Sequence, residues 1–129
     1  MLYIAQITQL GGINEEAYER SSVLGVFDDI HKAQRVCCKE LDKRIITDEM
    51  LEEMQQIWEK YKEIAVYGEY IPTKNNAQYK AEMEKFDFIF EEELLDTEII
   101  AEVLEYTLNE YCEKRKVVWE TSHINGNRF

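Results

Sequence analysis

Acidic side chains are concentrated in one part of the sequence. Residues 81–113 contain twelve acidic residues and one base, Lys85, so this window has a net charge of −11. The whole chain of 129 residues has a net charge of −12, and the rest of it is therefore nearly neutral. A charge of one sign over one region attracts cationic partners and repels polyanions. We therefore expect binding to a basic protein surface, not direct binding to nucleic acid or to a membrane.

Within this window, two groups of carboxylates are the candidate partner-binding residues. They are Glu91, Glu92, Glu93, Glu98, Glu102 and Glu105. The second group follows the spacing i, i+4, i+7, which would place it on one outer face of a helix with no lysine interleaved. Residues four apart on a helix are separated by about 6 Å along the axis, a spacing that imitates a row of backbone phosphates. The pattern predicts a surface that mimics nucleic acid or docks on a basic groove.

Two other interpretations of these carboxylates remain open. Lys32, Arg35, Lys39 and Lys43 would form a basic row on an earlier helix, and they could neutralise the acidic helix within the fold. Carboxylates are also ligands for hard divalent cations, but the run 91–93 lacks the spacing of a calcium loop. A solvated helix end or loop explains that run more simply. We expect no bound metal and no cofactor.

The histidines and cysteines carry no catalytic or metal-binding signature. His31 and His123 have no adjacent motif, so we interpret both as surface residues. Cys37, Cys38 and Cys112 do not match zinc spacings, and an odd cysteine count suits a reducing cytosol. The N-terminal stretch does not resemble a signal peptide, and no stretch approaches the ~20 apolar residues that span a bilayer. We expect a non-enzymatic protein in the cytoplasm.

Strands and a helix are predicted in the first third of the chain. The segment Leu2–Gln9 is predicted to be a central strand because both of its faces are apolar, and Ser21–Phe27 is a second strand. Asp28 or Asp29 would cap a helix that continues to about Arg44. The inward positions of this helix, spaced by three and four residues, are Ile30, Ala33, Cys37 and Leu41.

Helices dominate the prediction for the rest of the chain. Thr47 would cap a second helix with a core stripe that includes Trp58, and the composition of residues 75–93 favours helix. Asp96 or Thr97 would cap a third long helix. The inward residues of that helix would be Ile99, Ile100, Val103, Leu104, Leu108 and Tyr111. Short strands are predicted at Val66–Ile71 and Val117–Thr121.

These elements predict a single globular domain over residues 1–129. Its class is α+β, with a small, mostly antiparallel sheet of three or four strands packed by three or four helices. A hydrophobic content of 45%, an aromatic content of 12% and one proline are typical of a folded chain. A chain of this length can bury a core without disulfides or metals.

The acidic window Glu82–Glu113, the short chain and the lack of catalytic or targeting signals resemble small acidic proteins of phages and mobile elements. These include anti-CRISPR and anti-restriction inhibitors. The resemblance implies an inhibitor that binds the nucleic-acid groove of a host defence complex. An immunity protein against a basic nuclease toxin would have the same features. Two further classes stay open: a structural or regulatory homodimer with an aromatic contact surface, and a metal-dependent enzyme that uses the carboxylates.

Overall fold

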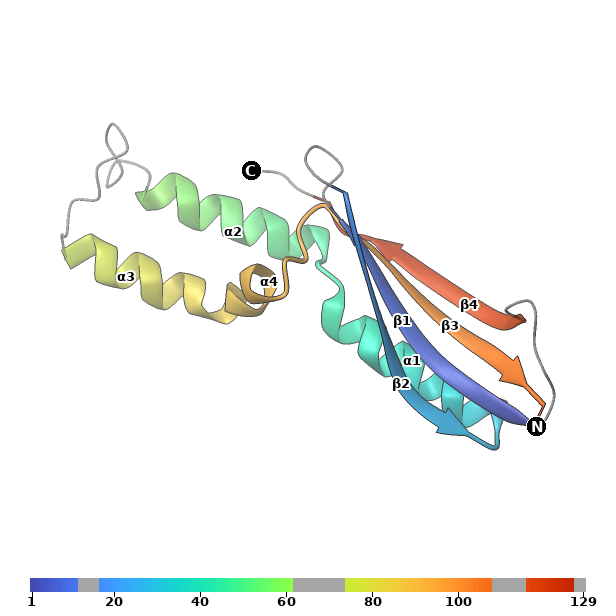
Figure 1. The fold of residues 1–129 in the computed structure, drawn as a ribbon. Helices are drawn as coiled ribbons and strands as arrows, with labels where there is room; N and C mark the ends of the chain where they lie inside the picture. The colour runs from blue at the N-terminus through green and yellow to red at the C-terminus, as the bar shows by residue number, and fades with distance from the viewer. Residues whose placement is uncertain (12–16, 62–73, 108–115, 127–129) are drawn as a thin grey trace. The chain divides into compact units, whose positions relative to one another are not determined.

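The computed structural model describes residues 1–11, 17–61, 74–107 and 116–126 (Figure 1). The chain forms two compact units. We call Met1–Ile45 with Asp96–Asn125 the sheet unit, and Ile46–Leu95 with Gly126–Phe129 the helical unit. The predicted α+β class is confirmed, because the sheet is antiparallel and helices are present in both units. The expectation of a single domain stays a prediction.

The sheet unit contains four antiparallel strands. They are β1 (Leu2–Gly11), β2 (Tyr18–Phe27), β3 (Glu98–Tyr106) and β4 (Val117–Ile124). Their order is β2-β1-β3-β4, and every neighbouring pair is antiparallel. The first strand is therefore central, as its two apolar faces predicted, and β2 and β4 form the edges. The predicted strands at both ends of the chain are confirmed with slightly wider bounds.

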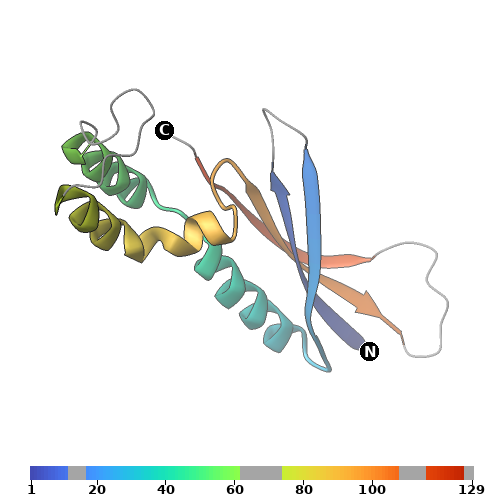
Figure 2. The same cartoon turned by 60° about the vertical axis from the view of Figure 1, so that its left-hand side comes forward.

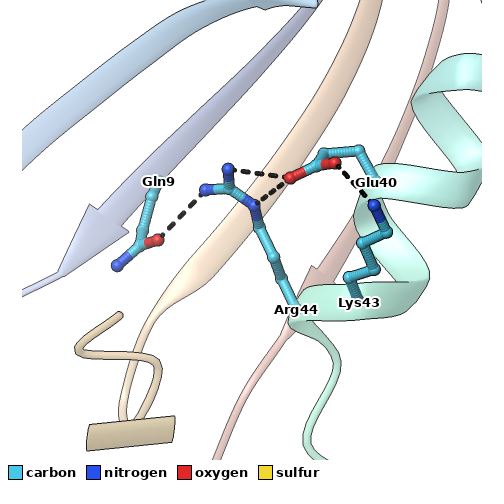
Figure 3. Close-up of polar contacts among 4 residues, drawn as sticks. All are labelled: Gln9, Glu40, Lys43 and Arg44. Carbon is cyan, nitrogen blue, oxygen red and sulfur yellow. Dashed lines mark hydrogen bonds and ion pairs between the residues drawn. The ribbon is translucent and has the colours of Figure 1, made fainter. Parts of the chain in front are cut away.

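Helix α1 (Ile30–Arg44) packs on one face of this sheet, over β1 and β3 (Figures 1 and 2). Its N-terminus is capped by Asp29, whose Oδ1 accepts a 2.7 Å hydrogen bond from the backbone N–H of His31. The predicted inward residues Ala33, Cys37 and Leu41 are buried. Figure 3 shows that Arg44 joins the last turn to β1, since its guanidinium contacts Gln9 of β1 as well as Glu40.

The two faces of the sheet differ in burial. The inner face, under α1, carries buried Ala5 and Ile7 of β1 opposite Val103 and Ala101 of β3. The outer face carries the alternate residues of each strand, because successive side chains on a strand point to opposite faces. No helix of the sheet unit covers the outer face within the described residues (Figure 2).

The predicted third long helix is wrong, because Glu98–Tyr106 is the strand β3. The composition of this segment suits a helix locally, but Ile99, Ile100 and Val103 are β-branched and favour a strand that packs on both sides. Pairing with β1 and β4 satisfies the backbone of β3 along its length. Asp96 is not a helix cap. Its positive φ of 54° places it in the turn that precedes the strand.

The helical unit contains the remaining helices. They are α2 (Asp48–Tyr61), α3 (Lys74–Met83), the 3₁₀ turn η3 (Glu84–Phe86) and α4 (Asp87–Glu91). The helix expected within residues 75–93 is thus confirmed, and Thr47 Oγ1 caps α2 by accepting from the N–H of Met50. Trp58 was expected in the core, but its side chain is 47% exposed. The strand predicted at Val66–Ile71, like Leu108 and Tyr111, lies outside the described residues.

Candidate protein-binding surfaces

Two of the predicted site residues, Glu98 and Glu102, lie on the outer face of the sheet. Glu102 pairs with Gln6 of β1 on one side and with Glu120 of β4 on the other. Glu98 is two outer-face positions away along the same strand. The sheet therefore groups Glu120, which was not predicted, with two of the predicted carboxylates. The sequence signal for it was the alternation along Val117–Ile124, which places Glu120, Ser122 and Ile124 on one face.

The outer face is both acidic and apolar. At its edges, Val23, Val26 and Ile124 are 63%, 56% and 70% exposed. Register positions place Glu19 on this face as well, opposite Leu10 of β1. We call the following set the acidic sheet face: Glu19, Glu98, Glu102 and Glu120, with Val23, Val26, Ile100 and Ile124. None of the outer-face positions of the described strands carries a basic residue.

Like charges directly opposite on adjacent strands repel each other. The pair Glu102–Glu120 occupies such positions, with Cβ atoms about 5 Å apart. Together with Glu19 and Glu98, the pair concentrates negative charge on this face, which attracts cations. The arrangement opposes folding slightly and favours a cationic partner.

Glu105 does not belong to this surface. It lies on the inner-face side of β3, and its Oε1 accepts a 2.8 Å hydrogen bond from Lys116 Nζ. This hydrogen bond raises the pKa of the Lys116 ammonium group. The predicted row of Glu98, Glu102 and Glu105 on one helical face is therefore wrong. A strand has a period of two residues, which separates Glu105 from the other two.

The other predicted group, Glu91, Glu92 and Glu93, follows the end of α4 in the helical unit. All three residues are exposed. Glu93 has a positive φ of 53° in the turn that leads to Leu94, whose N–H donates to the carbonyl of Ile89. This group and the acidic sheet face belong to different units of the chain.

The basic row on α1 does not neutralise the predicted acidic residues within the described part of the chain. Its Lys32 pairs with Asp28 at 3.7 Å, and its Lys43 pairs with Glu40 at 3.8 Å. Arg35 and Lys39, the two middle members, have no ion-pair partner among the described residues. The described residues therefore show no ion pairs between the basic row and the predicted acidic row.

Three members of the basic row, Arg35, Lys39 and Lys43, instead line a groove between α1 and the inner face of β4. The groove has a volume of about 980 Å³. We call it the basic groove, and its lining residues are His31, Gln34, Arg35, Cys38, Lys39, Asp42, Lys43 and Trp119. The sequence showed the basic spacing on the helix but not the indole of Trp119 beside it. A strand contributed from far along the chain provides that side chain.

The cysteine and histidine residues of the described part of the chain do not form a cluster. The thiol of Cys37 is buried and donates to the carbonyl of Glu102 at 3.3 Å, and burial raises its pKa. His123 was interpreted as a surface residue, but it lies on the inner face of β4 with a buried Nε2 that has no hydrogen-bond partner among the described residues. Across the described ranges, no group of three or more His, Cys, Asp or Glu residues is placed to hold a metal ion.

Comparison with protein-family models, curated proteins and solved structures finds no match to this chain. Function is therefore inferred from the charged surfaces of the molecule. In the described part of the chain, every helix is too short or too polar to cross a lipid bilayer.

Proposed function

We propose that this chain is a non-enzymatic binding protein that docks its acidic sheet face on a basic surface of a nucleic-acid-binding protein and inhibits it. The observation that supports the proposal is the cross-strand position of Glu102 opposite Glu120, on an outer face whose described strand positions include four glutamates and no basic residue. The proposal includes action in the cytoplasm of a bacterial host cell, as for the phage inhibitors that the chain resembles.

The geometry of the carboxylates refines the idea of nucleic-acid mimicry. Glu98 and Glu102 are four strand residues apart, or about 13 Å, whereas Glu102 and Glu120 are about 5 Å apart across the sheet. The charges therefore form a two-dimensional patch and not a single row with a 6 Å repeat. Such a patch suits a cluster of Lys and Arg side chains that surrounds a phosphate-binding site.

Apolar side chains at the edge of the patch support a protein partner. Val23, Val26 and Ile124 would contact the aliphatic stems of partner lysines and arginines, whose charged ends reach the carboxylates. The exposed group Glu91–Glu93 adds to the negative field that speeds encounter with a cationic surface. Association should therefore weaken as salt concentration rises.

The test uses the immobilised protein as bait for the proteins of a bacterial lysate that bind heparin. We expect capture that a DNA or RNA oligonucleotide displaces, followed by loss of nucleic-acid binding when the captured protein is assayed with the soluble chain. The variant E98Q/E102Q/E120Q should reduce capture by about tenfold or more. A matched variant, E49Q/E52Q/E84Q, removes the same number of charges from exposed positions in the helical unit. It should still capture the partner.

Two results would contradict the proposal. Equal loss of capture in both triple variants would mean that only net charge matters. Capture that oligonucleotides do not displace would mean that the bound surface is not a nucleic-acid site. If the captured protein is a nuclease toxin, the immunity-protein alternative is the correct subclass.

A homodimer with an aromatic contact surface is the second candidate. It is favoured by Trp58 and Phe90 of the helical unit, which are 47% and 51% exposed. Large exposed aromatic side chains are typical of contact surfaces. Sedimentation equilibrium should then show a dimer whose association is insensitive to salt and is lost in W58A/F90A. A monomer at all concentrations excludes this candidate.

A further inference from the structure

The basic groove lies beside an open edge of the sheet. Helix α1 packs mainly over β1 and β3, and the inner face of β4 is only half covered. Trp119, on that half-covered face, forms one side of the groove, and seven residues of α1 form the other. The groove is therefore an elongated depression of about 980 Å³ that follows the helix.

The positive charges along the groove are regularly spaced. Arg35, Lys39 and Lys43 follow i, i+4, i+8 on α1, and successive members are about 6 Å apart along the helix axis. Arg35 and Lys39 have no ion-pair partner among the described residues, and Asp42 is the one acidic residue of the lining. The groove is thus locally cationic although the chain as a whole is strongly acidic.

The adjacent strand β4 has the features of an unprotected edge. Within the described ranges, it pairs with β3 on one side and with no strand on the other. Edge strands are usually protected by lysine or proline, and Val117–Ile124 contains neither. Half of its residues are β-branched, a composition that favours pairing. The backbone N–H and C=O groups of β4 that point away from β3 can therefore accept an added strand.

We propose that the basic groove binds an extended acidic peptide segment of a partner protein, added as a further strand along the open edge of β4. Alternate side chains of an added strand point to the same face and are about 6.6–6.8 Å apart. This spacing approaches the 6 Å repeat of Arg35, Lys39 and Lys43. Acidic side chains at every second position would therefore meet successive cations on the inner face. The alternate positions would point to the outer face, where exposed Ile124 favours apolar side chains.

A peptide fits these features better than a single-stranded nucleic acid. Strand addition requires an amide backbone, which nucleic acids lack. A long polyanion would also be repelled by a chain of net charge −12, whereas a short segment with three or four carboxylates is repelled less. The groove and the acidic sheet face lie on opposite faces of one sheet and have opposite charge, so this interaction is independent of the function proposed above.

The test measures binding of a fluorescein-labelled peptide that alternates glutamate with valine, by fluorescence anisotropy at low salt. We expect saturable binding that weakens with salt. Two control peptides, one with glutamine in place of glutamate and one with a central proline, should bind at least about tenfold more weakly. The variant R35Q/K39Q should weaken binding of the acidic peptide by about tenfold. The control variant K32Q removes one charge from an exposed lysine of the same helix outside the groove and should retain binding of the acidic peptide.

Cys38 provides a second measurement that does not depend on substitution in the groove. Its exposed thiol lines the groove, whereas the Cys37 thiol is buried. In a Cys112→Ser background, bound peptide should slow alkylation of Cys38. The proposal is overturned by an unchanged alkylation rate at saturating peptide, by equal binding of the proline peptide, by an equal loss in K32Q, or by tighter binding of oligothymidylate than of the peptide.

Discussion

Replacing Glu120 with lysine should stabilise the sheet and weaken docking of the acidic sheet face. Glu120 lies directly opposite Glu102 on the neighbouring strand, so the two carboxylates repel each other in the folded state. A lysine at this exposed position converts the repulsion into attraction. The same substitution places a cation in the surface proposed to bind a basic partner. Stability and binding should therefore change in opposite directions.

The expected gain in stability follows from the distance between the charges at positions 102 and 120. Two unit charges about 5 Å apart in water interact with about 0.8 kcal/mol, so reversing one sign changes the energy by about 1.6 kcal/mol. Screening at about 0.15 M ionic strength reduces this to about 1 kcal/mol, within the range of exposed pairs. For a chain of this size, we expect the melting temperature to rise by roughly 3–5 °C.

The assay is urea unfolding followed by circular dichroism, for the wild type, E120K, E102Q and the double variant E102Q/E120K. The gain from E120K should be largest at low salt and should fall as salt is added. It should also fall sharply in the E102Q background, because the neutral glutamine neither repels glutamate nor attracts lysine. The difference between the two backgrounds measures the coupling of the pair.

Two results would refute the reasoning. A gain of the same size in the E102Q background would show that residue 120 acts through another group or through strand propensity alone. No gain at low salt would show that the two carboxylates do not interact. If E120K is more stable and still binds the captured partner normally, the acidic sheet face is not the docking surface.

Three further predictions concern the stability of the sheet unit. Asp29→Ala should lower the free energy of unfolding by about 0.5–2 kcal/mol in urea melts, because α1 loses its cap, whereas Asp29→Asn should lose much less. Asn125→Ala should cost about 1–3 kcal/mol in the same measurement, because the buried amide donates to the Arg44 carbonyl at 2.9 Å and lies 3.4 Å from Thr97 Oγ1; an unchanged midpoint would refute this role. Burial raises the pKa of the Cys37 thiol in the folded state. The contribution of the protonated thiol to the free energy of unfolding is therefore complete below the pKa of the thiol in the unfolded chain, about 8.5, and is lost as pH rises through its pKa in the folded chain. Unfolding between pH 7 and 10 should therefore show a shallower loss of stability in Cys37→Ala than in the wild type.

Features set by neighbouring residues were predictable from the sequence. Asp29 and Thr47 accept hydrogen bonds from N–H groups two and three residues away, so their capping roles depend on local order alone. The inward spacing of Ala33, Cys37 and Leu41 identified the buried face of α1 for the same reason. The apolar character of both faces of the first strand indicated its central place in the sheet.

The secondary structure of residues 98–106 was not predictable from neighbouring residues. Glutamate, alanine and leucine in this segment suit a helix, and its apolar residues fit a helical stripe nearly as well as a strand. The strand is selected by pairing with β1, about ninety residues earlier in the sequence, and with β4. This choice also determines the candidate site, because a period of two places Glu105 on a different face from Glu98 and Glu102.

The sequence by itself determined how much charge the chain carries and that most of it lies in one window, since these are covalent properties. Only the tertiary structure decided which charges act together, because electrostatic energy depends on distance and solvent exposure. It placed Glu102 opposite Glu120, paired Glu105 with Lys116, and left Arg35 and Lys39 beside Trp119. An acidic chain thereby acquires one acidic and one basic surface on opposite faces of the same sheet.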